Sequence, residues 1–532
     1  MVSYSQTQKT LIIFFYLIWF SFSFDHCKLN LNNPSDPTSR SFFETAVMNT
    51  YLSSICSPFI RGNVRIGSGN YKVYPHSLLP LKNGNFVVTA IVIEPIVWAG
   101  RTNGFNFSYT GATGTDPAIV IFQVNGRSFE IEWLDYLGVP ASNTENSNFS
   151  TLSEFSNGDI GVFTQVTGTE QIGAISPKLN SEAFMVARYS SSGSRVWFTY
   201  LDMAIGSFSI GSLNHIVDVN DQMHLFFTSI STGTNTPNTV GITEFPLPTF
   251  SSNGIYAGQR EIGWAILKGD GLPKQQRFIR TSGDAEVISA SYQKNGYILL
   301  GGSTNNNFDN FLSHPAVNYQ RSYAALLAPN TQEVLNISYP GSTNSAFNLG
   351  SIEEMKVGYD GYYATGTSAG SFGSPTYDYQ YFPSGNTRNY FFLKFDLFGN
   401  LIWNQFLGST ITNVMEQTPR IAYLSYFDEI RVKLLGNASG DRMTGLDLIS
   451  YGAGINPYQD ITLRINGRAG RYESIRYETN IFVTTPVSGL IGFNISVQDV
   501  CNGRLLSLRR YLNFPAENGF LEVSTKPGIE EP

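Results

Sequence analysis

Charged residues are scarce in this chain of 532 residues. They make up 14% of the sequence, against about a quarter in ordinary soluble proteins. The lysines and arginines are spread along the chain, so the basic cluster typical of nucleic-acid-binding proteins is missing. The composition therefore argues against nucleic acid as a partner. Aromatic residues also make up 14% of the chain, which is more than a disordered protein carries.

Histidine is rarer still, with five residues in the whole sequence. His26 falls inside the export signal described below, and the other four lack the spacing of a metal motif such as H-E-x-x-H. They are His76, His215, His224 and His314. Since His215 and His224 flank one predicted hairpin, we expect them to have structural roles. We predict no metal site and no cofactor.

Recognisable catalytic motifs are also lacking. Gly366–Gly370 matches G-x-S-x-G, but a nucleophile elbow of this pattern leads from a strand into a helix. Here a loop rich in Pro, Gly and Tyr follows instead. The adjacent acids Glu353 and Glu354 fit a solvated strand end better than an acid/base pair. We therefore predict that the chain is not an enzyme and assign no catalytic residues.

The chain begins with the pattern of a secretory signal. Lys9 precedes an apolar run from Leu11 to Phe20, and Asp25 follows soon after. A basic start and a short apolar run predict a signal peptide over residues 1–26, since the run is too short for a comfortable transmembrane helix. An uncleaved N-terminal anchor is the alternative.

The three cysteines suggest an anchor and a possible disulfide. Cys27 directly follows the signal, where it could be acylated, although Phe24 and His26 depart from the usual lipobox. Cys56 and Cys501 lie near opposite ends of the mature chain, so a disulfide between them could tie these ends together. Two buried free thiols are the alternative, and the sequence leaves both open.

Residues 27–58 are expected to form a polar tether and a short helix. Residues 28–40 include Asn30, Asn32, Asn33, Pro34, Asp36 and Pro37. Ser41 and Glu44 then have the spacing of a capping box, and apolar residues recur at helical intervals as far as Ile55. We predict a helix over 41–56.

Glycine and aromatic residues are what the chain has in abundance, with 50 Gly, 39 Phe and 29 Tyr. Many short strands joined by turns suit this composition. Two series of predicted hairpin turns alternate along the chain. The first comprises Asn83-Gly84, Asn157-Gly158, Asn220-Asp221, Asn295-Gly296, Asp360-Gly361 and Phe427-Asp428. The second comprises Asn125-Gly126, Ser192-Gly193, Asp270-Gly271, Pro329-Asn330, Gly399-Asn400 and Asn466-Gly467.

Two hairpins per repeat give four antiparallel strands, which is one blade of a β-propeller. Six blades fill residues 70 to about 475, and three further strands are expected at Asn480–Thr485, Leu490–Val497 and Arg504–Leu512. A strand around 63–66 would complete the seventh blade and close the ring. We therefore predict an all-β propeller of about seven four-stranded blades over 59–513, followed by a tail over 514–532. A sandwich or an open solenoid is the alternative.

Two stretches resemble known bacterial families. Phe184–Trp197 and Phe391–Trp403 each combine a Phe/Met-rich strand, a glycine turn and a tryptophan strand, and with Ala364–Thr367 they resemble SBBP-type propeller repeats. Cys27–Thr45, continuing to Cys56-Ser-Pro, resembles the start of leptospiral lipoproteins. The resemblance implies an acylated Cys27 and brings no catalytic residues with it.

Long connections are expected on one side of the ring, because the tight turns all fall on the other. Function tends to be carried by such loops on a rigid scaffold. We predict a binding surface formed by aromatic residues in two of them, with local packing as the alternative for each. These residues are Trp98, Phe105, Tyr109, Phe372, Tyr377, Tyr379 and Tyr381.

The sequence thus predicts an exported, envelope-anchored lipoprotein that acts as a monomer and binds a protein or glycan through this side. It would lie in the cell envelope, at the outer membrane, or be secreted if Cys27 is not acylated. A polysaccharide-active hydrolase or lyase and a structural envelope scaffold are the alternative functions.

Overall fold

The computed structural model is built of β-strands in every part that it describes, with no helix among those residues. The described residues are 63–66, 73–92, 118–138, 150–166, 183–201, 212–230, 260–279, 281, 284–293, 295–305, 308, 321–340, 350–368, 370–377, 389–407, 419–424, 428–437, 458–479, 481–485, 488–501, 504–513 and 518–526. The predicted signal, tether, helix, Cys27 and Cys56 lie outside these ranges. No helix in the described part is long and apolar enough to cross a membrane.

Six four-stranded antiparallel sheets follow one another along the chain. Blade 1 contains β2 (Val73–Pro80), β3 (Phe86–Val92), β4 (Ala118–Val124) and β5 (Ile131–Gly138). Blade 2 contains β6 (Ser150–Glu154), β7 (Ile160–Val166), β8 (Ala183–Tyr189) and β9 (Arg195–Leu201). Blade 3 contains β10 (Leu213–Val217), β11 (Met223–Ile230), β12 (Arg260–Leu267) and β13 (Pro273–Ile279).

The next three sheets repeat this order. Blade 4 contains β14 (Ala285–Tyr292), β15 (Ile298–Thr304), β16 (Arg321–Ala328) and β17 (Glu333–Ser338). Blade 5 contains β18 (Ser351–Val357), β19 (Gly361–Ser368), β20 (Asn389–Asp396) and β21 (Leu401–Leu407). Blade 6 contains β22 (Arg420–Leu424), β23 (Glu429–Asn437), β24 (Tyr458–Asn466) and β25 (Tyr472–Thr479). All twelve predicted turns fall at the hairpins of these blades.

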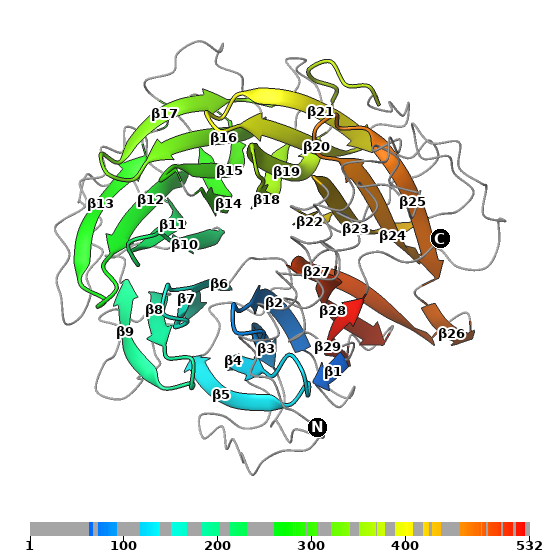
Figure 1. The fold of residues 1–532 in the computed structure, drawn as a ribbon, viewed down its shortest axis with the longest axis horizontal. Helices are drawn as coiled ribbons and strands as arrows, with labels where there is room; N and C mark the ends of the chain where they lie inside the picture. Colours follow the sequence, from blue (N-terminus) through cyan, green and yellow to red (C-terminus); the bar gives the residue numbers. More distant parts are fainter. Residues whose placement is uncertain are drawn as a thin grey trace, which may run out of the picture. The chain divides into compact units, whose positions relative to one another are not determined.

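The seventh blade joins the two ends of the ring. Its strands β27 (Ser488–Cys501), β28 (Arg504–Asn513) and β29 (Asn518–Lys526) pair in sequence, and β1 (Asn63–Ile66) pairs with β29. A further strand, β26 (Ile481–Thr485), extends the first half of β27. Figure 1 shows the seven sheets arranged as a ring with the first strand of each blade toward its centre. The predicted seven-bladed propeller is confirmed.

One boundary in the prediction needs correction. The predicted propeller ends at residue 513, but β29 lies beyond that residue and forms nine residue pairs with β28. The strand alternates apolar Leu521 and Val523 with polar Glu522 and Ser524, and the two apolar side chains are fully buried. This alternation of period two marks a half-buried strand. The four strands of the last blade are therefore β27, β28, β29 and β1, with β27 innermost. β26 is a fifth strand of the same sheet.

The core lies between the blades. Each blade packs the apolar residues of its two faces against its neighbours, and these form separate clusters around the ring. Burying each such side chain contributes roughly 1.5–3 kcal/mol. Among the described side chains, the cluster between blades 6 and 7 contains Ala422, Leu424, Val497 and Leu505.

Candidate functional site

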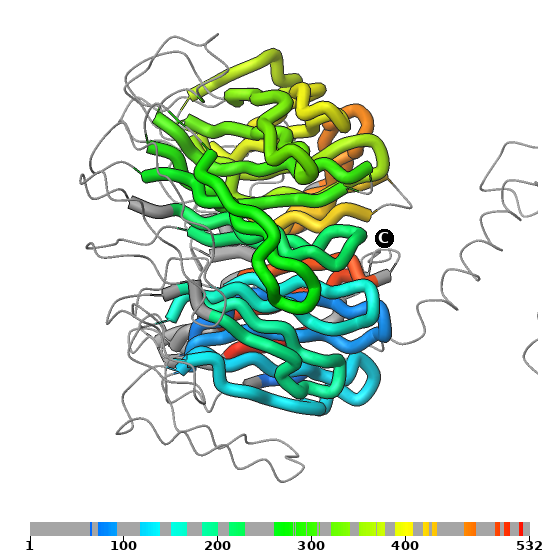
Figure 2. Tube along the Cα trace, turned by 90° about the vertical axis from the view of Figure 1, so that its left-hand side faces the viewer, coloured from blue at the N-terminus to red at the C-terminus, as the bar shows by residue number. Residues whose placement is uncertain are grey.

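The hairpin turns gather on one side of the ring, which we call the turn face (Figure 2). Antiparallel pairing places the turns between the first and second strands and between the third and fourth strands on this side. The connections between the second and third strands leave from the opposite side, which we call the loop face. They span residues 93–117, 167–182, 231–259, 305–320, 369–388 and 438–457. The predicted one-sided distribution of long connections is confirmed.

Tryptophans on outer strands fix the turn face to the next blade. The indole Nε1 of Trp133 donates to Ser191 O at 3.3 Å, and that of Trp197 donates to Gly269 O at 2.9 Å. Trp403 repeats the contact with Gly467 O at 3.1 Å. In blade 4, which lacks this tryptophan, Asn336 Nδ2 donates to Phe398 O at 2.8 Å. The motif on which the family resemblance was based therefore has a structural purpose: it joins neighbouring blades.

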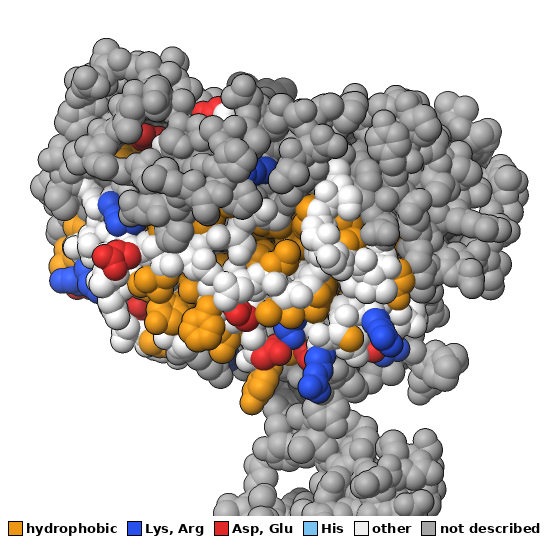
Figure 3. Space-filling view, turned by 90° about the horizontal axis from the view of Figure 1, so that it is seen from above, with side chains coloured by type: hydrophobic (Ala, Val, Ile, Leu, Met, Phe, Trp, Pro, Cys, Tyr) orange, Lys and Arg blue, Asp and Glu red, His pale blue; other side chains and the backbone are white. Residues whose placement is uncertain are grey.

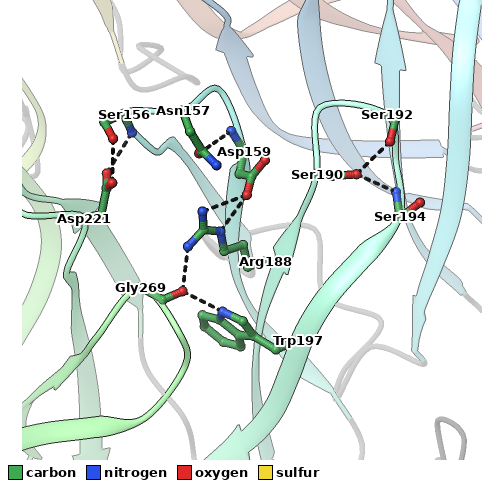
Figure 4. A network of polar contacts seen from close by, with 10 residues as sticks. All are labelled: Ser156, Asn157, Asp159, Arg188, Ser190, Ser192, Ser194, Trp197, Asp221 and Gly269. Carbon is green, nitrogen blue, oxygen red and sulfur yellow. Dashed lines mark hydrogen bonds and ion pairs between the residues drawn. The ribbon is translucent and has the colours of Figure 1, made fainter.

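The junction of blades 2 and 3 shows how dense these contacts are (Figure 4). Arg188 pairs with Asp159, its Nη2 lying 2.7 Å from Oδ2, and donates from Nη1 to Gly269 O at 2.6 Å. Its guanidinium also lies 4.2 Å from the ring centroid of Phe155. Asp221 accepts from the backbone N–H of Ser156 at 2.7 Å. These contacts tie the turns of blade 2 to those of blade 3.

The outer rim of blades 4 and 5 exposes single apolar side chains. Phe398 is 63% exposed, Ile402 55% and Leu335 42%. Figure 3 shows apolar side chains interspersed with polar ones on this edge of the ring. Scattered exposure of this kind is normal for a protein surface, so the rim gives no indication of a site.

Two of the predicted binding residues lie in the described start of the 369–388 connection, and the first is Phe372. Its side chain is 8% exposed and makes edge contacts with Phe391 and Phe406, at centroid distances of 5.5 and 4.9 Å. Its carbonyl accepts from Asn404 Nδ2 at 2.6 Å. Phe372 is therefore a packing residue, which was the alternative interpretation.

Tyr377, the second of them, is also held against the blades. Its ring stacks on Tyr472 with centroids 4.1 Å apart and planes 7° from parallel. Its backbone N–H donates to Gln405 Oε1 at 2.9 Å, and its carbonyl accepts from Phe406 N at 3.0 Å. The segment 370–377 thus packs across blade 5, from the cluster that blade 5 shares with blade 4 to Tyr472 of blade 6. The other predicted binding residues lie outside the described part: Trp98, Phe105, Tyr109, Tyr379 and Tyr381.

The histidines of blade 3 are structural, as predicted. His215 is buried between two hydroxyls of blade 2, with Nδ1 2.5 Å from Thr151 Oγ1 and Nε2 2.6 Å from Ser153 Oγ. Burial lowers its pKa from 6.5 to about 3, so the ring is neutral. His224 accepts from Trp264 Nε1 at Nδ1, at 3.3 Å, which leaves its Nε2 to face the Asp218 carboxylate.

The carboxylates on the inner strand of blade 5 also have individual structural partners. Glu354 accepts from the backbone N–H of Ile421 in blade 6 at 2.8 Å, and its other oxygen lies 3.0 Å from Lys356 Nζ. Lys356 also donates to Gln498 in blade 7, at 3.2 Å. Glu353 accepts from Thr367 Oγ1 at 3.2 Å. Each of these two acids thus contributes to contact between strands or blades.

The junction of blades 6 and 7 contains charges that the sequence analysis missed. Ile430 and Val432 of β23 pack toward blade 5, so the alternate residues Glu429, Arg431 and Lys433 face blade 7. They are 3%, 7% and 5% exposed. From the other side, the alternation of β28 turns Arg509, at 3% exposed, toward blade 6.

Only the tertiary structure brings these charges together, because four strands, β24 to β27, separate β23 from β28 in sequence. The signal present in the sequence was the charged alternation of Glu429, Arg431 and Lys433 in an otherwise apolar strand.

Residues able to hold a metal ion do not cluster in the described ranges, where no group of three or more His, Cys, Asp or Glu residues comes together. Cys501 is the last residue of β27. Its proposed partner Cys56 lies outside the described residues, so their pairing stays a prediction.

Comparisons with known proteins find distant structural similarities but no family. No family model and no curated protein matches the sequence. Among solved structures, a polysaccharide lyase of family PL25, an ulvan lyase, has 11% identity and a TM-score of 0.48, covering 88% of this chain and 96% of its own. The polysaccharide lyase Uly1 has 8% identity and a TM-score of 0.44, covering 88% and 100%.

Hydrazine synthase of Kuenenia stuttgartiensis, an enzyme of a different kind, has 7% identity and a TM-score of 0.41, covering 88% of this chain and 100% of its own. Similarities at this level do not indicate what this chain binds or whether it is an enzyme.

Proposed function

We propose that this chain is an exported propeller, tethered to the cell envelope through Cys27, that captures a protein or glycan with its loop face. One observation carries the proposal: every long connection between second and third strands leaves from one face of the ring. The other face is closed by tight turns whose polar groups bond to the next blade. A rigid scaffold with elaborated loops on one side is the usual arrangement of a binding protein.

The described start of the 369–388 connection narrows the proposed contact region. Phe372 and Tyr377 are occupied in packing, so the residues left for a ligand are those after Tyr377. That remaining segment contains Tyr379 and Tyr381 among Ser, Gly and Asn residues. Tyr in such company provides rigid contact area together with adaptable hydrogen bonding.

The test replaces residues 378–388 with a short Gly/Ser linker and retains 370–377. Capture would be measured on arrays of immobilised neutral and acidic glycans and extracellular-matrix proteins. We expect the replacement to lower capture at least tenfold without changing thermal stability, because the packed segment is kept. Tyr359→Ser is the matched control, since Tyr359 is an aromatic residue 88% exposed on the turn face and should not affect capture. Unchanged capture by the replacement variant would refute the proposed site.

The anchor needs a separate experiment. Mass spectrometry of the mature N-terminus from the native host would detect an acylated Cys27, and Cys27→Ser should release the protein into the medium. A mature N-terminus without lipid would contradict the tether and leave a secreted binding protein.

A further inference from the structure

We propose that the turn face of the ring lies against the surface of a lipid bilayer, with apolar side chains at its hairpin turns entering the headgroup region. The inference goes beyond capture by the loop face, since it gives a partner to the opposite side of the ring. It rests on the proposed function in one respect, that the chain ahead of β1 carries a membrane anchor.

The chain joins the ring from the turn face. β28 begins at this face, after the first hairpin of blade 7, and β29 runs antiparallel to β28 and so returns toward it. β1 is antiparallel to β29, with Asn63 opposite Ser524. Asn63, the first residue of β1, therefore lies toward the turn face, and Ile66 lies toward the loop face, where β2 begins.

This direction determines how an anchor would hold the ring. Cys27 precedes Asn63 in the chain, so a lipid on Cys27 would hold the ring from its turn face. The loop face is then directed away from the bilayer, where a ligand can reach it. The same arrangement brings the hairpin turns close to the lipid headgroups.

Exposed apolar side chains are found at these turns. The three most exposed large hydrophobic residues of the described part are Tyr359, Val219 and Phe398. Val219 lies in the first turn of blade 3, and Tyr359 and Phe398 lie in the two turns of blade 5. Single exposed apolar residues are ordinary on a protein surface, but these three share one face. Tyr359 suits the headgroup region because its ring is apolar and its hydroxyl is polar.

The charges exposed in the turns favour an anionic surface. Among the described turn residues, five exposed side chains are basic and two are acidic. The basic ones are Lys82, Arg127, Lys268, Arg468 and Arg471, and the acidic ones are Asp270 and Asp360. Asp221 and Asp428 are partly buried and contact the preceding blade. The chain as a whole carries a net charge of −7, so this positive excess is local.

A basic surface with apolar side chains and a lipid anchor act together in membrane binding. Basic residues near a bilayer are attracted to anionic headgroups, and a lipid chain and a basic surface each supply part of the affinity. Several turns are also tied to neighbouring blades by the indoles of Trp197 and Trp403. These turns are thus held in position before they meet the bilayer.

The first experiment measures binding of the unacylated mature chain, made with Cys27→Ser, to vesicles of equal parts phosphatidylcholine and phosphatidylglycerol by co-sedimentation. We expect the chain to bind these vesicles, and to bind less at high salt because the charges are exposed. Tyr359→Ser and Phe398→Ser should each weaken binding about fivefold, since partial burial of one such side chain gives less than the tenfold or more of full burial.

Leu335→Ser is the matched control, because Leu335 is an exposed apolar residue on the outer strand β17 and lies outside the turns. It should leave binding unchanged. Arg468→Gln should weaken binding to the mixed vesicles and have no effect on vesicles of phosphatidylcholine alone. Failure of the wild type to bind the mixed vesicles, or equal binding by the wild type and both aromatic variants, would overturn the inference.

The second experiment determines which face lies toward the lipid. A fluorophore is attached to the acylated chain through Ser192→Cys in a turn or Ser374→Cys in the 369–388 connection, with Cys56 and Cys501 replaced by Ser. Both serines are exposed. Brominated lipids in the vesicle should quench the probe at residue 192 more than the probe at residue 374. Equal or reversed quenching would contradict the proposed orientation.

The anchor and the lipid-facing surface can fail independently. If Cys27 proves not to be acylated but the unacylated chain binds vesicles through Tyr359 and Phe398, the surface stands and the tether falls. If Cys27 is acylated but the unacylated chain does not bind and both probes are quenched alike, the tether stands and the surface falls. Neither result depends on capture by the loop face, which is measured without lipid.

Discussion

At the scale of single residues, buried polar groups in this ring act as ties between blades. His215 belongs to blade 3, but both its ring nitrogens contact hydroxyls of blade 2. The hydroxyls of Thr151 and Ser153 carry no charge, and burial is the main cause of the lowered pKa of His215. Protonation of His215 is therefore expected to weaken the junction between blades 2 and 3.

This linkage predicts acid sensitivity with a defined sign. The pKa of His215 is about 3 in the folded chain against 6.5 for an exposed imidazole, so the unfolded state binds more protons between these two pH values. The neutral ring of His215 contributes to the free energy of unfolding. This contribution is complete above pH 6.5 and is lost as the pH falls toward 3. From pH 7 to pH 5 the loss is about 2 kcal/mol.

Urea denaturation of the wild type and His215→Gln at several pH values would measure it. The gap between their free energies of unfolding should narrow by about 2 kcal/mol from pH 7 to pH 5, because the glutamine cannot titrate. Parallel curves would contradict the assignment.

At the scale of elements, glycine turns and tryptophans form a pair that recurs from blade to blade. Gly193 has a φ of +87°, and a Cβ added to it would lie 2.4 Å from Trp133 Cγ of the preceding blade. Gly271 has the same relation to Trp197, at 2.8 Å from Cδ2. The glycine is thus required twice, once by its backbone conformation and once by the indole that covers it.

A matched pair of substitutions separates these two requirements. Gly158 has a φ of +86° but nothing within 4 Å of an added Cβ. Gly158→Ala should therefore cost only the backbone strain, about 1–2 kcal/mol. Gly193→Ala should cost about 1–3 kcal/mol more, because the indole must shift. Denaturant midpoints with unchanged slopes would give both values, and equal losses would show that Trp133 does not constrain the turn.

The turns were also the elements that the sequence predicted best. Asn-Gly and Asp-Gly pairs demand positive φ at defined positions, so their number and order fixed the blades without reference to packing. β29 was missed although Leu521–Ser524 alternates apolar and polar residues. Its location near the chain end suggested a tail, and only its pairing with β1 identifies it as part of a blade.

At the scale of the whole ring, closure depends on two strands distant in sequence. β29 holds β1 on one side and β28 on the other. Leu521 and Val523 from β29 are fully buried against blade 1. Without this strand, β28 would have an unpaired edge, a common cause of aggregation.

Truncation after Asn513 should therefore destabilise the ring, whereas truncation after Lys526 should not. Burial of Leu521 and Val523 alone is worth roughly 3–6 kcal/mol, so we expect the shorter chain to unfold at lower urea and to aggregate on size-exclusion chromatography. The longer truncation is the control, since it retains all of β29. Equal stability of the two would mean that closure does not depend on this strand.

The sequence by itself determined the repeat, the positions of the turns and the face from which the long connections leave, because these follow from local backbone chemistry and antiparallel pairing. Tertiary structure alone decided that Phe372 and Tyr377 pack against partners in other strands. It also decided that Arg431, Lys433 and Arg509 share one junction. Charge proximity between blades depends on ring closure, which no local pattern in the chain encodes.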